Sequence, residues 1–384
     1  MTKKERIMNV FEHKDVDYLP SQITFSDRKR DQLFAETMGF ASEYELFEYF
    51  ENHIYWTYSG DDTAIFYRND IELMKQLEEE GYTIVDEEDG IIFDRWGGGL
   101  VVEADGICWI PGIFEGDEKA NKIRRKYLPE KFIRLMEMPL KEGVAAYEAP
   151  DPLEAGNLKW LIRDKDGVEG DLCVIPAGYV GTYERAYTLL GWEQYMTEIA
   201  LNPELVSQMM DKITDHKIAL GKKKAELGYK IIHHGDDLGT QLSGFFSKDM
   251  FREIILPQYK KMFKSFKENG QYIFMHSCGC LMDYLPDLID IGLDGLEPIQ
   301  PCNDLKRLKE EFGKELVFMG GIDSQKLPFL TPGEVKEMAL EVMTILGKDG
   351  GYIIAPSQEI MWDVPDENVV ALVDTIKEYR DKVM

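Results

Sequence analysis

The sharpest chemical signal in the sequence is the segment HSCGC at 276–280. Side chains two residues apart on an extended strand share a face, so His276 and Cys278 can point into one site. Imidazole and thiolate together form a zinc-type ligand pair. Three residues could supply a third ligand: Cys280 if the chain stays extended, Cys302 if the next strand end lies close, and Glu297 if the site uses a carboxylate. The alternative is that His276 and the cysteines are ordinary core residues, since free cysteine is commonly buried.

A second group of titratable residues lies in HHGDDLGTQ at 233–241. A histidine beside aspartates at a strand end could orient a substrate or exchange a proton with it. We therefore predict catalytic roles for Asp236 and Asp237 and a substrate-binding role for His234. An ordinary helix N-cap in a solvated loop is the alternative. Asp323, which follows a Gly-Gly pair, is a third catalytic candidate, although aspartate is also a common turn residue.

Further polar and aromatic residues follow other predicted strands. Tyr179 and Tyr183 come after the strand expected at 173–176 and could line a cleft, although aromatic residues at helical spacing are more often core. Gln300 and Gln358 each follow a strand nearer the end of the chain. We predict that these four side chains contact the substrate.

The elements that must position these residues alternate between short apolar strands and longer amphipathic helices from Leu158 onward. The predicted strands are 173–176, 229–233, 272–276, 295–298, 315–319 and 351–355, and the predicted helices are 192–200, 203–227, 248–269, 281–291, 303–312, 331–346 and 366–383. Repeated units of this kind produce a parallel sheet. Because no G-x-G-x-x-G fingerprint follows any strand, we favour an α/β fold of the (β/α)8 TIM barrel type over a doubly wound sheet.

The first third of the chain has a different sequence pattern. Short strands separated by glycine and acidic turn residues are expected at 82–86, 90–96, 100–104 and 107–110, so that 55–125 is predicted to be a β-rich insertion. The whole chain, 1–384, is then one decorated barrel domain. Pro257 and Pro286 fall inside two predicted helices and should kink or split them.

Composition narrows the class of protein. The 384 residues carry 44 basic and 71 acidic side chains, a net charge of −27, which argues against nucleic acid and other polyanions as partners. The first fourteen residues contain no apolar core segment, and no stretch of about 18 apolar residues occurs, which argues against secretion and membrane spanning. The cysteines are five and therefore odd in number, so a reducing cytoplasm is expected. A homodimer, the commonest symmetric assembly, could form.

Several segments together resemble the uroporphyrinogen decarboxylase superfamily, and within it the corrinoid-dependent methyltransferases. They are ERIMNVFEHKDVDYLP (5–20), AYTLLGWEQYMTEIALNPELV (186–206), GDDLGTQ (235–241), HSCGC, GLDGLEPIQ (292–300), FMGGID (318–323) and GGYIIAPSQEIMWDVPDEN (350–368). The resemblance covers most of the chain. It implies a (β/α)8 barrel whose cleft lies at the carboxyl ends of the strands.

The resemblance also bears on the metal ligands. In the thiol methyltransferases that this chain resembles, zinc is held by a His-x-Cys pair on one strand and a further cysteine near the last strand. His276 and Cys278 match the pair, whereas the last strand end, 355–358, reads APSQ and has no cysteine. The decarboxylase proper grips a polyanionic substrate with arginines of an early loop, and here Arg28 and Arg30 lie in a loop of different spacing.

The resemblance therefore implies a zinc-dependent methyltransferase. It would move a methyl group between a small methylated substrate, a methoxy, amine or thiol compound, and a corrinoid (cobalamin) cofactor carried by a partner corrinoid protein. One alternative is a metal-free decarboxylase-type lyase in which Asp236 or Asp237 stabilises a protonated intermediate. Another is a barrel that binds a corrinoid or a small ligand without catalysis.

Overall fold

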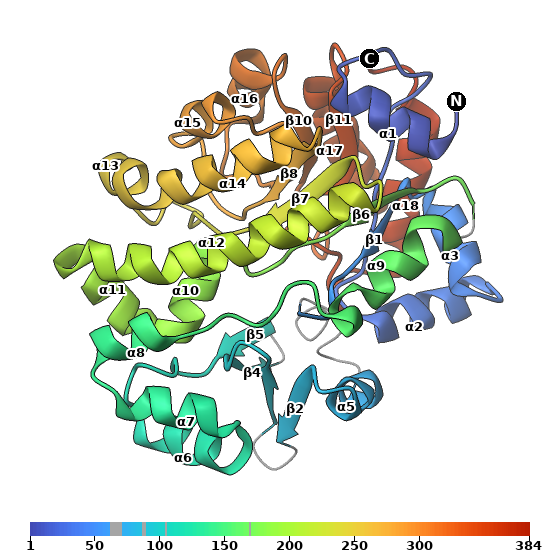
Figure 1. Cartoon of the computed structure of the whole chain (residues 1–384). Helices are drawn as coiled ribbons and strands as arrows, with labels where there is room; N and C mark the ends of the chain where they lie inside the picture. The colour runs from blue at the N-terminus through green and yellow to red at the C-terminus, as the bar shows by residue number, and fades with distance from the viewer. Residues whose placement is uncertain (62–70, 87–89, 104–105, 169) are drawn as a thin grey trace.

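The computed structural model describes residues 1–61, 71–86, 90–103, 106–168 and 170–384. Parallel strands that alternate with helices build its carboxyl-terminal half (Figure 1). Five strands form the main parallel sheet, in the order β11-β10-β9-β8-β7. They are β7 Ile231–Gly235, β8 Tyr272–His276, β9 Gly295–Ile299, β10 Val317–Ile322 and β11 Tyr352–Pro356. The predicted α/β fold with parallel strands is confirmed.

Helices of this half connect successive strands, as parallel pairing requires, except the last one, which follows β11. They are α10 Thr182–Leu190, α11 Trp192–Leu201, α12 Pro203–Glu226, α13 Lys248–Met250, the π-helical turn η1 Phe251–Ile255, α14 Leu256–Glu268, α15 Leu285–Asp290, α16 Leu305–Phe312, α17 Pro332–Gly347 and, after β11, α18 Asp366–Tyr379. The helical segment around Pro257 is interrupted by η1, in agreement with the predicted irregularity. Pro286 neither kinks nor splits a helix: it stands in the first turn of α15, which begins at Leu285 rather than at Leu281. Proline fits the first turn because the missing N–H has no partner there anyway.

A second parallel pair extends the arrangement. Strand β1 (Ile54–Thr57) pairs with β6 (Cys173–Pro176), and Ser21 forms isolated bridges to both Asn52 and Ile354. These bridges connect the pair to β11. Within the described residues no strand ladder joins β6 to β7, so closure into a (β/α)8 barrel is not confirmed.

The region between β1 and β6 contains the four short strands predicted there, and neighbouring strands pair antiparallel. They form one sheet in the order β2-β3-β4-β5, and Figure 1 shows β2, β4 and β5 set apart from the parallel strands. The sheet consists of β2 Thr83–Asp86, β3 Ile91–Asp94, β4 Gly99–Glu103 and β5 Gly106–Trp109. Helices accompany it: α5 Ile71–Glu79, α6 Glu118–Tyr127, α7 Glu130–Glu137, α8 Leu140–Ala146 and α9 Ala155–Gly167. A β-rich insertion with the bounds 55–125 is not confirmed, because β1 belongs to the parallel strands and residues 62–70, 87–89 and 104–105 lie outside the described residues.

The apolar side chains between the parallel strands form their own core. Ile54, Ile175, Ile231, Phe274, Val317 and Ile353 belong to it, together with Ile7, Val10 and Phe11 of helix α1 (Lys3–Phe11). The rings of Phe11 and Phe274 stand edge to face with centroids 5.3 Å apart. Burying one such side chain stabilises the fold by roughly 1.5–3 kcal/mol. Phe274 lies two residues before His276 on the same face of β8, which leaves the carboxyl ends of the strands for polar groups.

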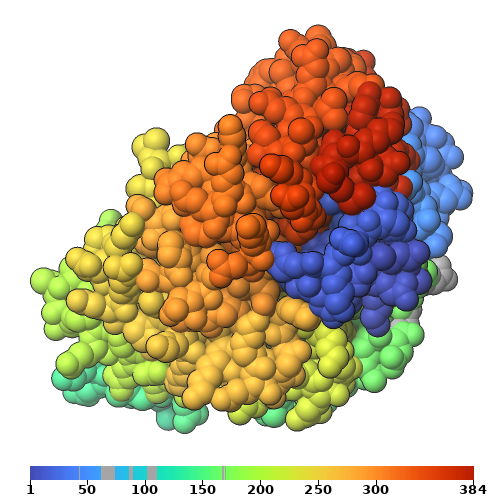
Figure 2. Space-filling view, turned by 90° about the horizontal axis from the view of Figure 1, so that it is seen from above, coloured from blue at the N-terminus to red at the C-terminus, as the bar shows by residue number. Residues whose placement is uncertain are grey.

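The two ends of the described chain meet. Figure 2 shows the blue amino-terminal segment against the red carboxyl-terminal one, and the backbone N–H of Leu19 donates to the carbonyl of Arg380 at 3.2 Å. Helices α2 (Arg28–Met38) and α3 (Glu43–Phe50) complete this side. Across the described ranges, no helix combines the length and apolar character that crossing a bilayer demands.

Candidate metal centre

Three donor atoms from two neighbouring strand ends converge at the carboxyl end of the sheet. The Nε2 atom of His276 lies 3.4 Å from Oδ1 of Asp237 and 3.8 Å from Sγ of Cys278. The three ligand atoms lie within 4.8 Å of one another, and the three residues are half-buried. Nitrogen, sulfur and carboxylate oxygen in such a group are suitable zinc ligands.

Local backbone geometry explains why Asp237 and Cys278 meet. Asp237 follows β7, Cys278 follows β8, and these strands pair in register from Ile231 with Tyr272 to Gly235 with His276. The backbone N–H of Cys278 donates to Oδ1 of Asp237 at 2.8 Å. This hydrogen bond between two candidate metal ligands therefore connects the loop after β7 to the loop after β8.

Gly279 turns the chain immediately after Cys278. Its φ is 93°, and a Cβ placed there would lie 2.2 Å from the carbonyl carbon of Gly239. The chain does not stay extended, so Cys280 leaves the strand direction. The thiols of Cys280 and Cys302 belong to neither three-donor group found within the described residues.

Gly279→Ala is expected to destabilise the protein by about 1–3 kcal/mol, because it combines an unfavourable φ with a clash against fixed backbone. It should also weaken metal binding by displacing Cys278. Gly270→Ala is a matched control, because Gly270 has a φ of 70° and nothing lies within 4 Å of its Cβ position. Urea unfolding and zinc titration measure both effects. Equal losses of stability and zinc affinity in the two variants would show that the close contact between Gly279 and the Gly239 backbone is not what makes Gly279 necessary.

Glu297 of β9 contacts the ring nitrogen of His276 that faces away from Cys278. Its Oε1 lies 2.8 Å from Nδ1 of His276 and 2.8 Å from Nε2 of His233. Burial acts to raise the pKa of this carboxyl, but the two histidines outweigh it and lower that pKa to about 2. Glu297 is therefore an ionised carboxylate in a buried position. His233, His276 and Glu297 also form the second three-donor group.

Burial and charged neighbours together set the pKa values of His276 and Cys278. Burial acts to lower the pKa of His276, yet Glu297 and Asp237 outweigh it and hold that pKa well above its usual value. Burial raises the pKa of the Cys278 thiol, and His276 offsets part of this rise.

The two predicted glutamines contact the loop that carries Cys278. Nε2 of Gln358 donates to Sγ of Cys278 at 3.6 Å, so Gln358 reaches the candidate ligand itself. Oε1 of Gln300 accepts hydrogen bonds from the backbone N–H of Gly279 at 2.9 Å and from Nε2 of Gln241 at 2.7 Å. Gln300 is buried and holds the turn in place.

Asp236 differs sharply from its neighbour Asp237. Its side chain is fully buried, and its carboxylate accepts hydrogen bonds from the backbone N–H groups of Thr182, Tyr183 and Glu184 and from the hydroxyl of Tyr259. These N–H groups are the unpaired donors at the start of α10. The structure therefore gives Asp236 a helix-capping position.

The remaining predicted residues divide between the site and its surroundings. The ring of Tyr179 lies 5.7 Å from the ring of His276 and 5.4 Å from that of His233, so it lines the site. Tyr183 is buried among other aromatic rings. His234 points to Asp236, with Nε2 3.3 Å from Oδ2. Asp323 accepts from the backbone N–H of Gln325 at 3.1 Å and pairs with Lys326, which makes it part of a local turn.

One acidic residue near the site has no counterpart in the sequence predictions. Glu184, in the first turn of α10, has a pKa held well above its usual value by burial and by the charges of Asp237 and Asp236. Its position three residues after Gly181 at a helix start is an ordinary place for glutamate. No local pattern therefore distinguishes it from the many surface carboxylates of this chain.

Comparison with known proteins identifies a family and several relatives that the chain resembles. A family model described as uroporphyrinogen decarboxylase (URO-D) matches residues 131–379. The methylcobamide:CoM methyltransferase MtaA of Methanosarcina barkeri is 28% identical over 221 residues, which are 57% of this chain and 61% of that protein. The uroporphyrinogen decarboxylase of Syntrophotalea carbinolica is 25% identical over 179 residues, 45% of this chain and 49% of that enzyme. The matches thus span about half to three fifths of these relatives.

A solved structure shares the fold over nearly the whole length. It is a methyltransferase from Methanosarcina mazei, with a TM-score of 0.59 and 18% sequence identity, and the match covers 99% of each chain. The segment from 131 to 379 that the family model matches includes all of the residues that form the two three-donor groups.

Proposed function

Because this chain belongs to the uroporphyrinogen decarboxylase family, we propose that it is a zinc-dependent methyltransferase acting between a small methylated substrate and a corrinoid cofactor on a separate protein. The observation that carries the proposal is the convergence of His276 Nε2, Cys278 Sγ and Asp237 Oδ1 within 4.8 Å. The similarity to a relative named for a methylcobamide substrate supports the choice of methyl transfer.

The donor set fits zinc in its chemistry. It contains one imidazole, one thiol and one carboxylate, and three protein ligands with an open fourth position are typical of catalytic zinc. His276, Cys278 and Asp237 would hold the ion, which supplies a Lewis acid that activates a thiol or polarises a leaving group. Asp237 takes the place of Cys280, Cys302 and Glu297, the three candidates for a third ligand that the sequence leaves open. Gly279 turns the chain away from the extended path that Cys280 would need.

Other residues of the chain would prepare the site for the substrate. The amide of Gln358 donates to Sγ of Cys278 and so favours the thiolate form. The ring of Tyr179 lies beside His276 and shields one side of the site from water. Gln300, through the N–H of Gly279, keeps the turn that aims Cys278.

We further propose that the parallel strands close into a single (β/α)8 barrel. Just past β6, the carbonyl of Gly178 accepts from the N–H of Gly235 at 2.6 Å, which supports pairing at the open edge. The site would then lie at the barrel mouth, where substrates reach catalytic groups in such folds. We expect the protein to work in the cytoplasm, where Cys278 stays reduced.

A metal-free lyase of the decarboxylase type has less support. Its polyanionic substrate needs free arginines, yet the guanidinium of Arg30 is buried and donates to Asp366 at 2.6 Å and to the carbonyl of Val364 at 2.9 Å. Asp236, one of the two acids that such a mechanism would use, is occupied by the start of α10.

The activity itself can be tested with free cobalamin. The zinc-loaded protein, mixed with cob(I)alamin and methoxy, methylamine or methylthiol donors, is expected to form methylcobalamin with at least one donor, followed by the visible spectrum. Cys278→Ala should form none. Undiminished methyl transfer by Cys278→Ala, or by protein stripped of zinc, would contradict the proposal. Absence of transfer with every donor would favour a ligand-binding barrel.

A further inference from the structure

We propose that His233 is a positioning residue for the metal centre: it holds Glu297, and Glu297 in turn fixes the proton of His276 on Nδ1 and leaves Nε2 for the metal. The inference rests on the proposed zinc site. It adds a residue that would touch neither metal nor substrate, and it follows from the direction of three hydrogen bonds.

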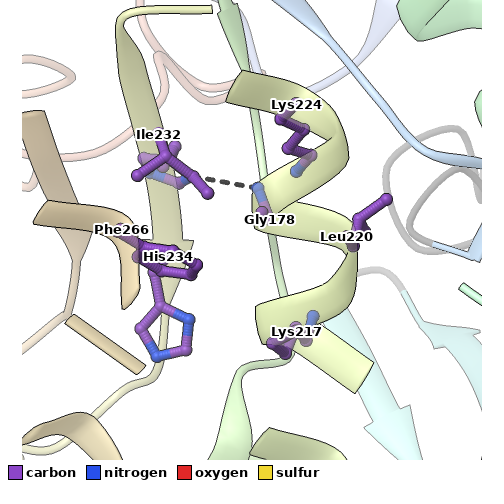
Figure 3. Close-up of a pocket in the computed structure, with 9 residues that line it drawn as sticks. Gly178, Lys217, Leu220, Lys224, Ile232, His234 and Phe266 are labelled. Atoms are coloured by element: carbon purple, nitrogen blue, oxygen red, sulfur yellow. Dashed lines mark hydrogen bonds between the residues drawn. The ribbon is translucent and has the colours of Figure 1, made fainter. Parts of the chain in front are cut away.

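The first bond sets the tautomer of His233. The backbone N–H of Gly178 lies 3.2 Å from Nδ1 of His233, and the dashed line at Gly178 in Figure 3 marks this hydrogen bond. A backbone N–H can only donate, so Nδ1 must carry the lone pair. The ring proton of a neutral His233 is therefore on Nε2.

The second and third bonds converge on one carboxylate oxygen. Nε2 of His233 donates to Oε1 of Glu297 at 2.8 Å, and Nδ1 of His276 donates to the same atom at 2.8 Å. Because one carboxylate oxygen lies within hydrogen-bond distance of both ring nitrogens, it accepts from both. With its proton on Nδ1, His276 presents Nε2 to Asp237 and Cys278. A carboxylate behind a metal-binding histidine orients that ring and increases its basicity.

These directions also distinguish the two three-donor groups. If His233, His276 and Glu297 held a cation, Nε2 of His233 would have to lose its proton while Nδ1 still faced the N–H of Gly178. Such a ring would be an imidazolate, which is unfavourable in a buried site. His233 therefore supports the site rather than binding the ion, and the Asp237, His276 and Cys278 group is the one left for the metal.

The surroundings of His233 keep its ring in one orientation. The rings of Trp56, Tyr179 and Phe274 lie 5.0, 5.4 and 5.8 Å from it. On the side of α12, a cavity of about 20 Å³ is lined by Lys217, Leu220, Lys224 and Ile232, and Figure 3 shows Ile232 opposite the helix that carries the other three. The space is about that of one water molecule, so the ring has little room to turn. In this enclosed position its hydrogen bond to Glu297 is stronger than it would be in water.

Two amide substitutions at position 233 test separately the hydrogen bond made by Nε2 and the one made by Nδ1. In His233→Gln the amide nitrogen can reach the place of Nε2 and donate to Glu297, whereas in His233→Asn the shorter amide can replace only Nδ1. We expect His233→Asn to weaken zinc binding by about 10- to 100-fold, the usual effect of losing such a supporting group, and His233→Gln to restore most of it. His216→Gln, at another buried histidine next to Pro150, is the control and should bind zinc normally.

The readouts are zinc affinity by chelator competition and the visible spectrum of the cobalt(II)-substituted protein. Equal affinities and identical spectra for His233→Asn and the unsubstituted protein would overturn this inference and leave the zinc proposal standing. Equal weakening by His233→Asn and His216→Gln would also overturn it, because the effect would then be a general loss of stability. If the unsubstituted protein binds no zinc, both proposals fail together.

Discussion

Cys278→Ser is expected to remove most of the zinc from the protein, whereas Cys280→Ser leaves it bound. Sγ of Cys278 lies 3.8 Å from Nε2 of His276, and both belong to the group that includes Asp237. Serine is a much poorer ligand, because zinc favours the soft, ionised sulfur of cysteine over a hydroxyl that stays protonated. Cys280, two residues further, has passed the turn at Gly279 and lies outside that group.

The comparison is informative because the two substitutions are chemically identical and two residues apart. Elemental analysis of protein purified without chelator should give about one zinc per chain for the unsubstituted protein and for Cys280→Ser, the stoichiometry of a single mononuclear site, and a value near background for Cys278→Ser. Methyl transfer should follow the zinc content. Loss of zinc from Cys280→Ser with retention in Cys278→Ser would contradict the assignment of Cys278 as the thiol ligand and indicate Cys280 instead.

Asp236→Ala is expected to destabilise the protein by at least about 4 kcal/mol, since four donors lose their partner and each buried donor left without one costs about 1–3 kcal/mol. The variant would orphan three backbone N–H groups at the start of α10 and the hydroxyl of Tyr259, which now lie 2.7 to 3.1 Å from the carboxylate oxygens. The shift should appear in urea unfolding of metal-free protein.

Asp237→Ala provides the contrast. Its carboxylate is half-exposed and is bonded mainly to the N–H of Cys278, so its removal should change stability by about 1 kcal/mol or less, as is usual outside the core. It should nevertheless weaken zinc binding. If the two alanine variants unfold at the same urea concentration, the separate assignment of a structural and a metal-binding aspartate is wrong.

The parallel strands could be located from sequence because they are nearly continuous apolar runs bounded by glycine and polar residues. Their ends were harder to place. The strand predicted at 229–233 is observed as β7 at Ile231–Gly235, since two histidines resemble the start of a loop rather than the end of a buried strand. The extended backbone there sends His233 to Glu297 and His234 to Asp236. Nothing in the local pattern distinguishes these two environments.

The ligand pair was predictable for the same local reason, and the third ligand was not. His276 ends β8 and Cys278 lies two residues further along the chain, so their spacing alone brings them together. Asp237 joins them through a contact between residues 41 positions apart, and Asp236 is removed from the site by α10, whose first turn is 52 to 54 positions away in the sequence. Those contacts depend on packing that periodicity does not encode.

The most direct test of the account is zinc K-edge X-ray absorption of the purified, unsubstituted protein. Ligation by His276, Cys278 and Asp237 predicts a single sulfur neighbour at about 2.3 Å and nitrogen or oxygen neighbours at about 2.0–2.2 Å, with an imidazole scattering pattern. Two or more sulfur neighbours would contradict the ligand set and return Cys280 or Cys302 to it. Protein that takes up no zinc at all would contradict the metal centre itself.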